Sequence, residues 1–214
     1  MTTIDVQNPV ARRLAVRRSR LLNRLTIGWN VAEGVVAVIA GTMAGSVSLV
    51  GFGLDSGIEV SAAVILAWRL GKEKGAGCMS HFDRRATRLI AVSFAVLAAY
   101  VGVESIRDLI GRQAPEASIV GIILAAVSLM VMPLLAGAKR RLAPALGSRA
   151  AASEANQTSL CALLSAVLLV GLDLNAVLGW WWADPFAGLL IATLAGMEAV
   201  RTWRAEALAD TCCG

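Results

Sequence analysis

Six apolar stretches, each long enough to cross a bilayer, constrain the fold of this chain more than any other feature of its sequence. A helix needs about 20 predominantly apolar residues to span the hydrocarbon core. Such a helix satisfies its own backbone hydrogen bonds, which lipid cannot do. The sequence therefore predicts an all-α, polytopic membrane protein with six transmembrane helices near the following ranges: Leu25–Met43, Val47–Trp68, Leu89–Ile110, Ile119–Ala138, Asn156–Leu178 and Pro185–Trp203.

The composition agrees with a chain that lies mostly in lipid. Hydrophobic residues make up 57% of the 214 residues and charged residues 16%, whereas soluble domains average about 45–50% and about 25%. The links between the apolar stretches are short, so we expect one transmembrane domain over residues 25–205. A basic N-terminal arm over residues 1–24 precedes it, and a short cysteine-containing tail over residues 206–214 follows it.

The basic residues predict how the helices cross the membrane. Of the 20 lysine and arginine residues, all except Arg107 and Arg112 lie in the arm, in the second and fourth links, or near the C-terminal end. Cytoplasmic segments carry such an excess, so we expect both termini to be cytoplasmic. The net charge of +5 then reflects topology and attraction to anionic lipid. No basic patch interleaved with aromatic residues is present in the sequence, so we expect no nucleic-acid partner.

Asp55 and Glu59 place two carboxylic acids near the middle of the second apolar stretch. They are four residues apart, so they project from one face of a helix. A charged side chain at the bilayer centre costs at least about 2.5–3.5 kcal/mol, and adjacent carboxylates repel each other. Either both acids are neutral and hydrogen-bonded between helices, or a cation lies between them. Because ionisable residues inside spans mark ion pathways, the pair favours a cation site.

The fifth apolar stretch supplies candidate partners for this pair. Glu154, Gln157 and Cys161 fall on one helical face, and Cys161 lies at about the depth of Asp55 and Glu59. A thiolate and two carboxylates suit a divalent transition metal, and the sulfur favours softer ions such as zinc, cadmium or mercury. Gln157 is a candidate neutral ligand or a helix-packing residue, and Glu154 is a candidate ligand or ion-pair partner at the cytoplasmic mouth. The alternative for Cys161 is a small core residue.

The first apolar stretch adds two polar residues, Asn30 and Glu33. They are three residues apart and share a helical face. Glu33 is the third acid well inside a span. We assign both residues to the pathway, as lining of an aqueous route or as proton carriers, with a hydrogen bond to a neighbouring helix as the alternative.

Three further cysteines lie on the predicted cytoplasmic side, where thiols stay reduced. Cys78 and His81 form a C-x-x-H pair, and Cys212 and Cys213 stand just before the final residue. Each pair is a candidate cytoplasmic metal site. The alternatives are an incidental loop sequence and a tail with two incidental thiols.

Small residues and one Asp-Pro pair predict where helices pack and where one begins. Gly41–Gly45 and Gly53–Gly57 are GxxxG segments, which allow two helix backbones to approach closely. Asp184 and Pro185 predict the start of the last helix, with Asp184 as its cap and Pro185 at its first helical position.

Together these motifs resemble the cation diffusion facilitator family over nearly the whole chain. Glu33 and the later segment Gly45–Leu49 are similar to the end of the family's first span and the turn after it. Asp55 and Glu59 are similar to its D-x-x-x-D or H-x-x-x-D ligand pair, and Gly179–Pro185 to its G-W-x-x-x-D-P opening of span six. The resemblance implies six spans with cytoplasmic termini and export of divalent metals, usually against protons.

Two departures from the family pattern affect what we expect. The family has H-x-x-x-D in span five, where alignment on Ser165 places Gln157 and Cys161. The family usually adds a cytoplasmic domain after span six, whereas this sequence stops at Gly214. We therefore expect a short, bacterial-type member of the plasma (inner) membrane whose homodimer would form through the spans.

The expected activity is secondary transport. We expect export of a divalent transition-metal cation, such as zinc, cadmium, cobalt or a softer ion, by proton antiport. The metal is the transported substrate, and no prosthetic group is expected. The sequence lacks a P-loop pattern, so we expect neither ATP hydrolysis nor another enzymatic activity. The alternative is a non-transporting metal sensor or partner subunit on the same scaffold.

Overall fold

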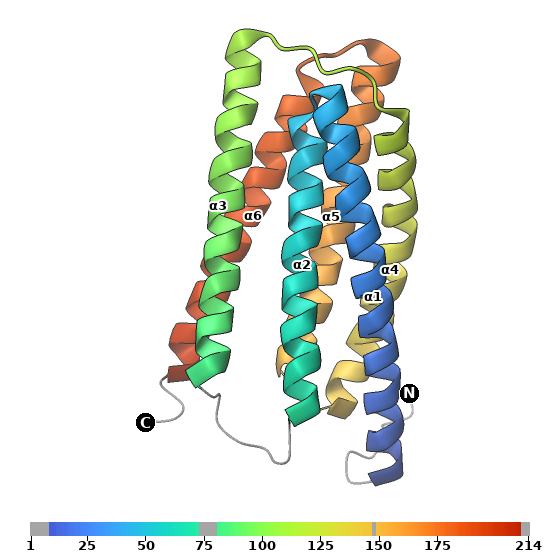
Figure 1. The fold of residues 1–214 in the computed structure, drawn as a ribbon, viewed down its shortest axis with the longest axis vertical. Helices are drawn as coiled ribbons and strands as arrows, with labels where there is room; N and C mark the ends of the chain where they lie inside the picture. The colour runs from blue at the N-terminus through green and yellow to red at the C-terminus, as the bar shows by residue number, and fades with distance from the viewer. Residues whose placement is uncertain (1–8, 73–80, 147–148, 211–214) are drawn as a thin grey trace.

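Six helices make up the part of the chain that the structure describes (Figure 1). The structure is a computed structural model and describes residues 9–72, 81–146 and 149–210. All six helices are long and apolar enough to cross a membrane, which confirms the predicted all-α membrane fold. Their bounds are α1 Pro9–Ala44, α2 Val47–Lys72, α3 His81–Gly111, α4 Ile119–Leu146, α5 Arg149–Leu178 and α6 Ala183–Asp210.

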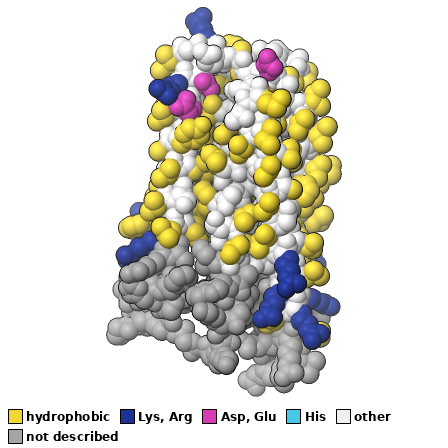
Figure 2. Space-filling model, viewed as in Figure 1, with side chains coloured by type: hydrophobic (Ala, Val, Ile, Leu, Met, Phe, Trp, Pro, Cys, Tyr) yellow, Lys and Arg dark blue, Asp and Glu magenta, His cyan; other side chains and the backbone are white. Residues whose placement is uncertain are grey.

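The bundle is apolar on its surface and polar in parts of its interior, as expected for a protein that lipid surrounds. Figure 2 shows hydrophobic side chains over the middle of the visible face. Ile110, Ile119 and Leu134 are 71–80% exposed, whereas Asn30 and Glu33 are each 1% exposed. Lipid favours apolar groups on the outside, so the polar side chains can find partners only between the helices.

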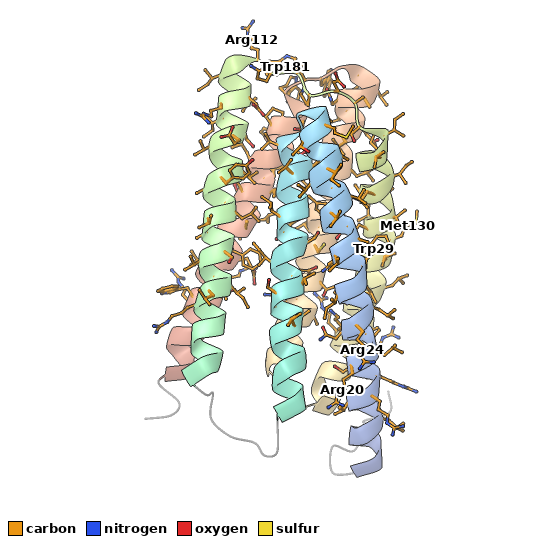
Figure 3. All side chains as sticks on the ribbon, in the orientation of Figure 1. Arg20, Arg24, Trp29, Arg112, Met130 and Trp181 are labelled. Atoms are coloured by element: carbon orange, nitrogen blue, oxygen red, sulfur yellow. The ribbon has the colours of Figure 1, made fainter. Side chains whose placement is uncertain are left out.

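The two ends of the bundle differ in chemistry. α1 begins and α6 ends at the same end, where Arg20 and Arg24 lie (Figure 3), and we name it the basic end. The opposite end carries Trp181 (Figure 3), and we name it the tryptophan end. Trp180 and Trp182 stack there with ring centroids 5.1 Å apart, as suits residues of a membrane interface. The charge distribution predicts that the basic end faces the cytoplasm, and this orientation stays a prediction.

The helix ends agree with the predicted ranges at the tryptophan end and extend beyond them at the basic end. α1 begins at Pro9 and not near Leu25, so residues 9–24 of the predicted arm are helical. α3 begins at His81 and not near Leu89, which shortens the predicted loop. Hydropathy falls where the lipid ends, but a helix continues as long as its residues favour it, and arginine and alanine both do.

The helices pack as three antiparallel pairs. α1 packs on α2, α4 on α5, and α3 on α6, and these are the most extensive contacts in the bundle. α1 also packs on α4, and α2 on α5, so these four helices form one group, which we name the four-helix group. The α3–α6 pair joins it through α2 and α5, and Figure 1 shows α3 at one side of the bundle.

The turn between α1 and α2 shows how the sequence ends one helix and starts the next. Gly45 has a φ of 65°, which glycine adopts without strain, and the Ser46 N–H donates to the Gly41 carbonyl at 2.9 Å. These two features close α1 as in a Schellman motif. The Ser46 hydroxyl then accepts from the Leu49 N–H at 3.1 Å and caps α2. The turn predicted at Gly45–Leu49 is therefore confirmed.

The close approach of α1 and α2 depends on some of the predicted small residues and not on others. A Cβ atom on Gly53 would lie 3.0 Å from the Gly34 carbonyl oxygen, and one on Gly41 would lie 2.8 Å from the Val50 nitrogen. A Cβ atom on Gly57 would meet nothing within 4 Å. Within the Gly53–Gly57 segment, an added methyl group would therefore meet α1 at Gly53 but not at Gly57.

We expect Gly53→Ala to lower the free energy of unfolding by about 1–2 kcal/mol, because the added methyl must push the α1 backbone away. Gly57→Ala is the matched control on the same helix, and we expect it to be neutral or stabilising by up to about 1 kcal/mol, since alanine favours helix. Reversible unfolding in mixed detergent micelles measures both. Equal losses for the two variants would show that the Gly53 contact does not hold the helices together.

Candidate functional site

A stripe of polar residues on α1 faces the interior of the four-helix group. Asn23, Thr26, Asn30 and Glu33 recur every three or four residues, so they lie on one helical face, and each is at most 3% exposed. The Asn23 amide donates to the Ala63 carbonyl of α2 at 2.9 Å. The stripe leads from the basic end toward the middle of the bundle.

Glu33 lies where α1, α2 and α5 meet. Its Oε1 accepts a hydrogen bond from the Trp29 indole at 3.3 Å, and its Oε2 accepts one from the Ser56 hydroxyl at 3.0 Å. The Cys161 thiol of α5 lies 3.9 Å from the same Oε2. Glu33, which the sequence assigned to the pathway, therefore contacts the predicted sulfur ligand directly.

The predicted acidic pair of α2 faces the same interior. Glu59 is 5% exposed, and its Oε2 accepts a hydrogen bond from the Asn30 amide at 2.5 Å. Asp55 is 2% exposed, and its Oδ1 has no hydrogen-bond partner among the described residues. Asp55 lies close enough to Glu33 and Glu59 for their charges to repel. Three acids therefore gather in the membrane interior, where uncompensated charge is costly.

α5 brings Cys161 into contact with these acids, whereas Gln157 makes no hydrogen bond with them. Cys161 is fully buried, its thiol hydrogen-bonds to Glu33, and Glu59 lies close to it. Gln157 is buried one turn nearer the basic end and makes no hydrogen bond with another described residue. Within the described ranges, no three His, Cys, Asp or Glu side chains form a group that could hold a metal ion as they stand. The acids and the thiol are thus neighbours without forming a complete ligand set.

Other predicted metal residues fall where the structure gives no account of them. Cys78, Cys212 and Cys213 lie outside the described residues. His81 begins α3 and Glu154 lies on α5, but their side chains are not among those described. Their roles as cytoplasmic ligands stay predictions.

Glu198 on α6 is a neighbour of the site that reasoning from the sequence missed. It lies close enough to Asp55 for their charges to repel. Its side chain is 14% exposed and pairs with Arg201 at 3.7 Å. An acid inside the last apolar stretch was the available signal, but a charge so near the basic end is also typical of a surface ion pair. Ser56 was missed too, although a serine between two buried acids was a visible signal.

Asp184 supports a different helix from the one that the sequence predicted. It is fully buried in the first turn of α6, and its Oδ1 accepts hydrogen bonds from the hydroxyls of Ser46, at 2.6 Å, and Ser48. The prediction that Asp184 caps its own helix is therefore wrong. α6 already begins at Ala183, and the carboxylate turns to the start of α2, whose N-terminus carries partial positive charge.

Comparison with known proteins assigns no function to this site. No protein-family model matches the chain, and no curated protein sequence matches it. The basis for a function is therefore the chemistry of the cluster itself. Three carboxyl groups and one thiol, from α1, α2 and α5, lie buried together inside a membrane bundle.

Proposed function

We propose that this chain is a secondary transporter that exports a divalent transition-metal cation from the cytoplasm in exchange for protons. The observation that carries the proposal is the burial of Glu33, Asp55, Glu59 and Cys161 side by side within six membrane helices. Ionisable groups at such depth mark ion or proton pathways. The resemblance to the cation diffusion facilitators supports the same function and a place in the bacterial plasma membrane, with the basic end in the cytoplasm.

The cluster has the chemistry to hold a divalent ion that has lost part of its water. Asp55 and Glu59 supply anionic oxygens, and Cys161 supplies the sulfur that softer metals prefer. Asp55 Oδ1 accepts no hydrogen bond from a described residue, so an arriving ion displaces no donor from it. Because these groups do not yet form a complete ligand set, binding requires small side-chain rotations, with Gln157 or water completing the shell.

The same groups can exchange the metal for protons. Carboxylates and thiols must lose their protons to bind a metal ion, so protons that arrive from the tryptophan end release the ion. Glu33 lies 3.9 Å from the Cys161 sulfur and is placed either to join the ligands or to take the proton that the thiol gives up. The metal is cargo in this scheme, and no covalent step is needed.

A proton-coupled exporter of an organic cation is the second candidate. One observation favours this candidate. In the part of the chain that the structure describes, no three His, Cys, Asp or Glu side chains are arranged so that they could hold a metal ion. Buried acids that do not meet the geometry of a metal can still carry protons and balance an organic ammonium group.

Transport by the purified full chain in liposomes tests both candidates. We expect an acidic lumen to drive uptake of Zn²⁺ or Cd²⁺, together with loss of protons from the lumen. Uptake of an organic cation without competition from metals would favour the second candidate. Metal binding without any flux would indicate a sensor or partner subunit instead.

Cys161→Ser is expected to change which metal the protein prefers. Replacing sulfur with oxygen should weaken Cd²⁺ binding by about tenfold or more, because soft ions prefer thiolate, and should alter Mn²⁺ binding little. Titration of both ions into purified protein measures the difference. Ser165→Ala is the control, since this buried hydroxyl on the same helix donates only to the Cys161 carbonyl, at 2.8 Å. An equal change for Cd²⁺ and Mn²⁺ would exclude the sulfur as a ligand.

A further inference from the structure

Ser105 on α3 is a buried hydroxyl that makes no hydrogen bond with another described residue. Its side chain is 0% exposed, and its Oγ has no partner. Other serines inside these helices, such as Ser56, Ser159 and Ser165, donate to the carbonyl four residues before them. A hydroxyl that is buried without any hydrogen bond costs free energy, so Ser105 calls for an explanation.

The Ser105 hydroxyl lies against α6, which packs along α3 over much of its length (Figure 1). A Cβ atom on Gly188 would overlap the Ser105 Oγ, so the hydroxyl fills the space of a side chain at that position. Asp184 stands four residues before Gly188, one turn nearer the tryptophan end and on the same helical face. The unpartnered hydroxyl therefore faces the side of α6 that carries Asp184.

One carboxylate oxygen of Asp184 is left without a partner. Its Oδ1 accepts hydrogen bonds from the hydroxyls of Ser46 and Ser48, and the backbone N–H groups of Val47 and Ser48 lie close to the carboxylate. Its Oδ2 is buried and has no hydrogen-bond partner among the described residues. The start of α2 thus fixes the orientation of the carboxylate and leaves Oδ2 for a further partner.

Asp108 brings a second acid to the same place. It stands three residues after Ser105 on α3 and lies close enough to Asp184 for their charges to repel. It is half-buried and forms no ion pair with a described residue. It also lies in the last turn of α3, where the carbonyl end of a helix carries partial negative charge and disfavours an acid. A bound cation would offset both effects.

We propose that Asp184, Asp108 and Ser105 form a second cation site, between α3 and α6 at the tryptophan end, for a hard divalent cation such as Ca²⁺. All three donors are oxygens, which Ca²⁺ prefers, and its flexible coordination lets water complete the shell. Two carboxylates match the double charge of the ion. Mg²⁺ suits the site less, because it demands nearly octahedral geometry and loses its water reluctantly.

The second site is separate from the cluster of acids around Cys161. Ser48, which donates to Asp184, stands seven residues before Asp55 on α2, or about 10 Å along the helix axis. The partial exposure of Asp108 opens the second site to the solution at the tryptophan end. The inference goes beyond the proposed function, since a cation can bind here whether or not the chain transports metal.

Calorimetric titration of Ca²⁺ into the purified full chain in a nonionic detergent tests the proposal. We expect a Kd of about 10⁻⁴–10⁻³ M, as for weak calcium sites outside cells. Asp108→Asn is expected to weaken binding at least about tenfold, and Ser105→Ala about threefold, since each loses an oxygen ligand. Asp173→Asn removes an acid on α5 near the same end, and we expect this control to stay within about twofold of the parent protein.

Thermal unfolding of Ser105→Ala separates ion binding from a structural role. Because the Ser105 hydroxyl has no hydrogen bond to lose, we expect the variant without Ca²⁺ to be as stable as the parent protein or more stable. With Ca²⁺ we expect it to gain less stability than the parent protein, since an ion that binds the folded state stabilises it according to its affinity.

Three results would overturn the proposal. The first is a parent protein that does not bind Ca²⁺, and the second is unchanged affinity in both Asp108→Asn and Ser105→Ala. The third is a loss of Ca²⁺ binding in Asp55→Asn but not in Asp108→Asn, which would place the ion in the cluster around Cys161. The first two results would leave the proposed function standing, because metal flux in liposomes tests that function separately.

Discussion

Asp55→Asn is expected to reduce divalent-cation flux by at least about 100-fold while leaving the bundle as stable as before or more stable. Asparagine has the size of aspartate but lacks the anionic oxygens that offset the charge of a metal ion. A loss of about 3 kcal/mol in binding the ion corresponds to that change in rate. Asp55 Oδ1 has no hydrogen bond to lose among the described residues, and Glu33 and Glu59 repel the Asp55 charge.

Flux into liposomes and unfolding in detergent, measured on the same preparation, test this prediction. Glu116→Gln is the matched control, because Glu116 is an exposed acid in the link between α3 and α4, far in sequence from the cluster. We expect its flux to match that of the parent protein. Full flux in Asp55→Asn would show that this carboxyl group does not bind the transported ion. A lower free energy of unfolding in that variant would show that the carboxyl group has a structural role instead.

Asp184→Ala is expected to lower the free energy of unfolding by about 3 kcal/mol, the largest stability effect that we predict for a single side chain here. Ser46 and Ser48 would both lose their acceptor inside the bundle. Hydrogen bonds between membrane helices contribute about 0.6–1.7 kcal/mol each, and a carboxylate at a helix N-terminus adds up to about 2 kcal/mol. Asp184→Asn keeps an acceptor oxygen, so we expect an intermediate loss.

Asp173→Ala is the control for this prediction. Asp173 lies on α5 near the same end, is only half-buried, and makes no hydrogen bond with a described residue. We expect its stability to stay within about 0.5 kcal/mol of the parent protein. If Asp184→Ala were as stable as Asp173→Ala, the contact between α6 and the start of α2 would not hold these helices together.

Hydropathy predicted the helix ends well at one end of the bundle and poorly at the other, for a physical reason. At the tryptophan end the lipid boundary coincides with residues that stop a helix, such as Gly45 and Gly179, both with a φ of 65°. At the basic end the lipid stops but the helix does not, because the arginines around Arg17 favour helix as much as the apolar residues do. The length of a helix at the basic end therefore depends on the helix propensity of its residues, which hydropathy does not measure.

The candidate site was predictable within one helix and not between helices. The spacing of Asp55 and Glu59 fixes their shared face, and both are buried. The contact of Glu33 with Cys161 depends on how α1, α2 and α5 align, which the packing of small residues such as Gly53 determines. The burial of Lys139 is unpredictable from the sequence for the same reason, since its neighbour Arg140 is exposed and only the packing of the helices buries Lys139.

The hydrogen bonds from Ser46 and Ser48 to Asp184 hold the start of α6 against the start of α2 at the tryptophan end. Glu198 lies 14 residues further along this helix, or about 21 Å from that contact at 1.5 Å per residue. A tilt of α6 by roughly 10° about the contact would therefore displace Glu198 by about 4 Å and Asp184 hardly at all. Any movement of α6 that keeps these bonds would change the surroundings of Asp55 and leave the tryptophan end as it is.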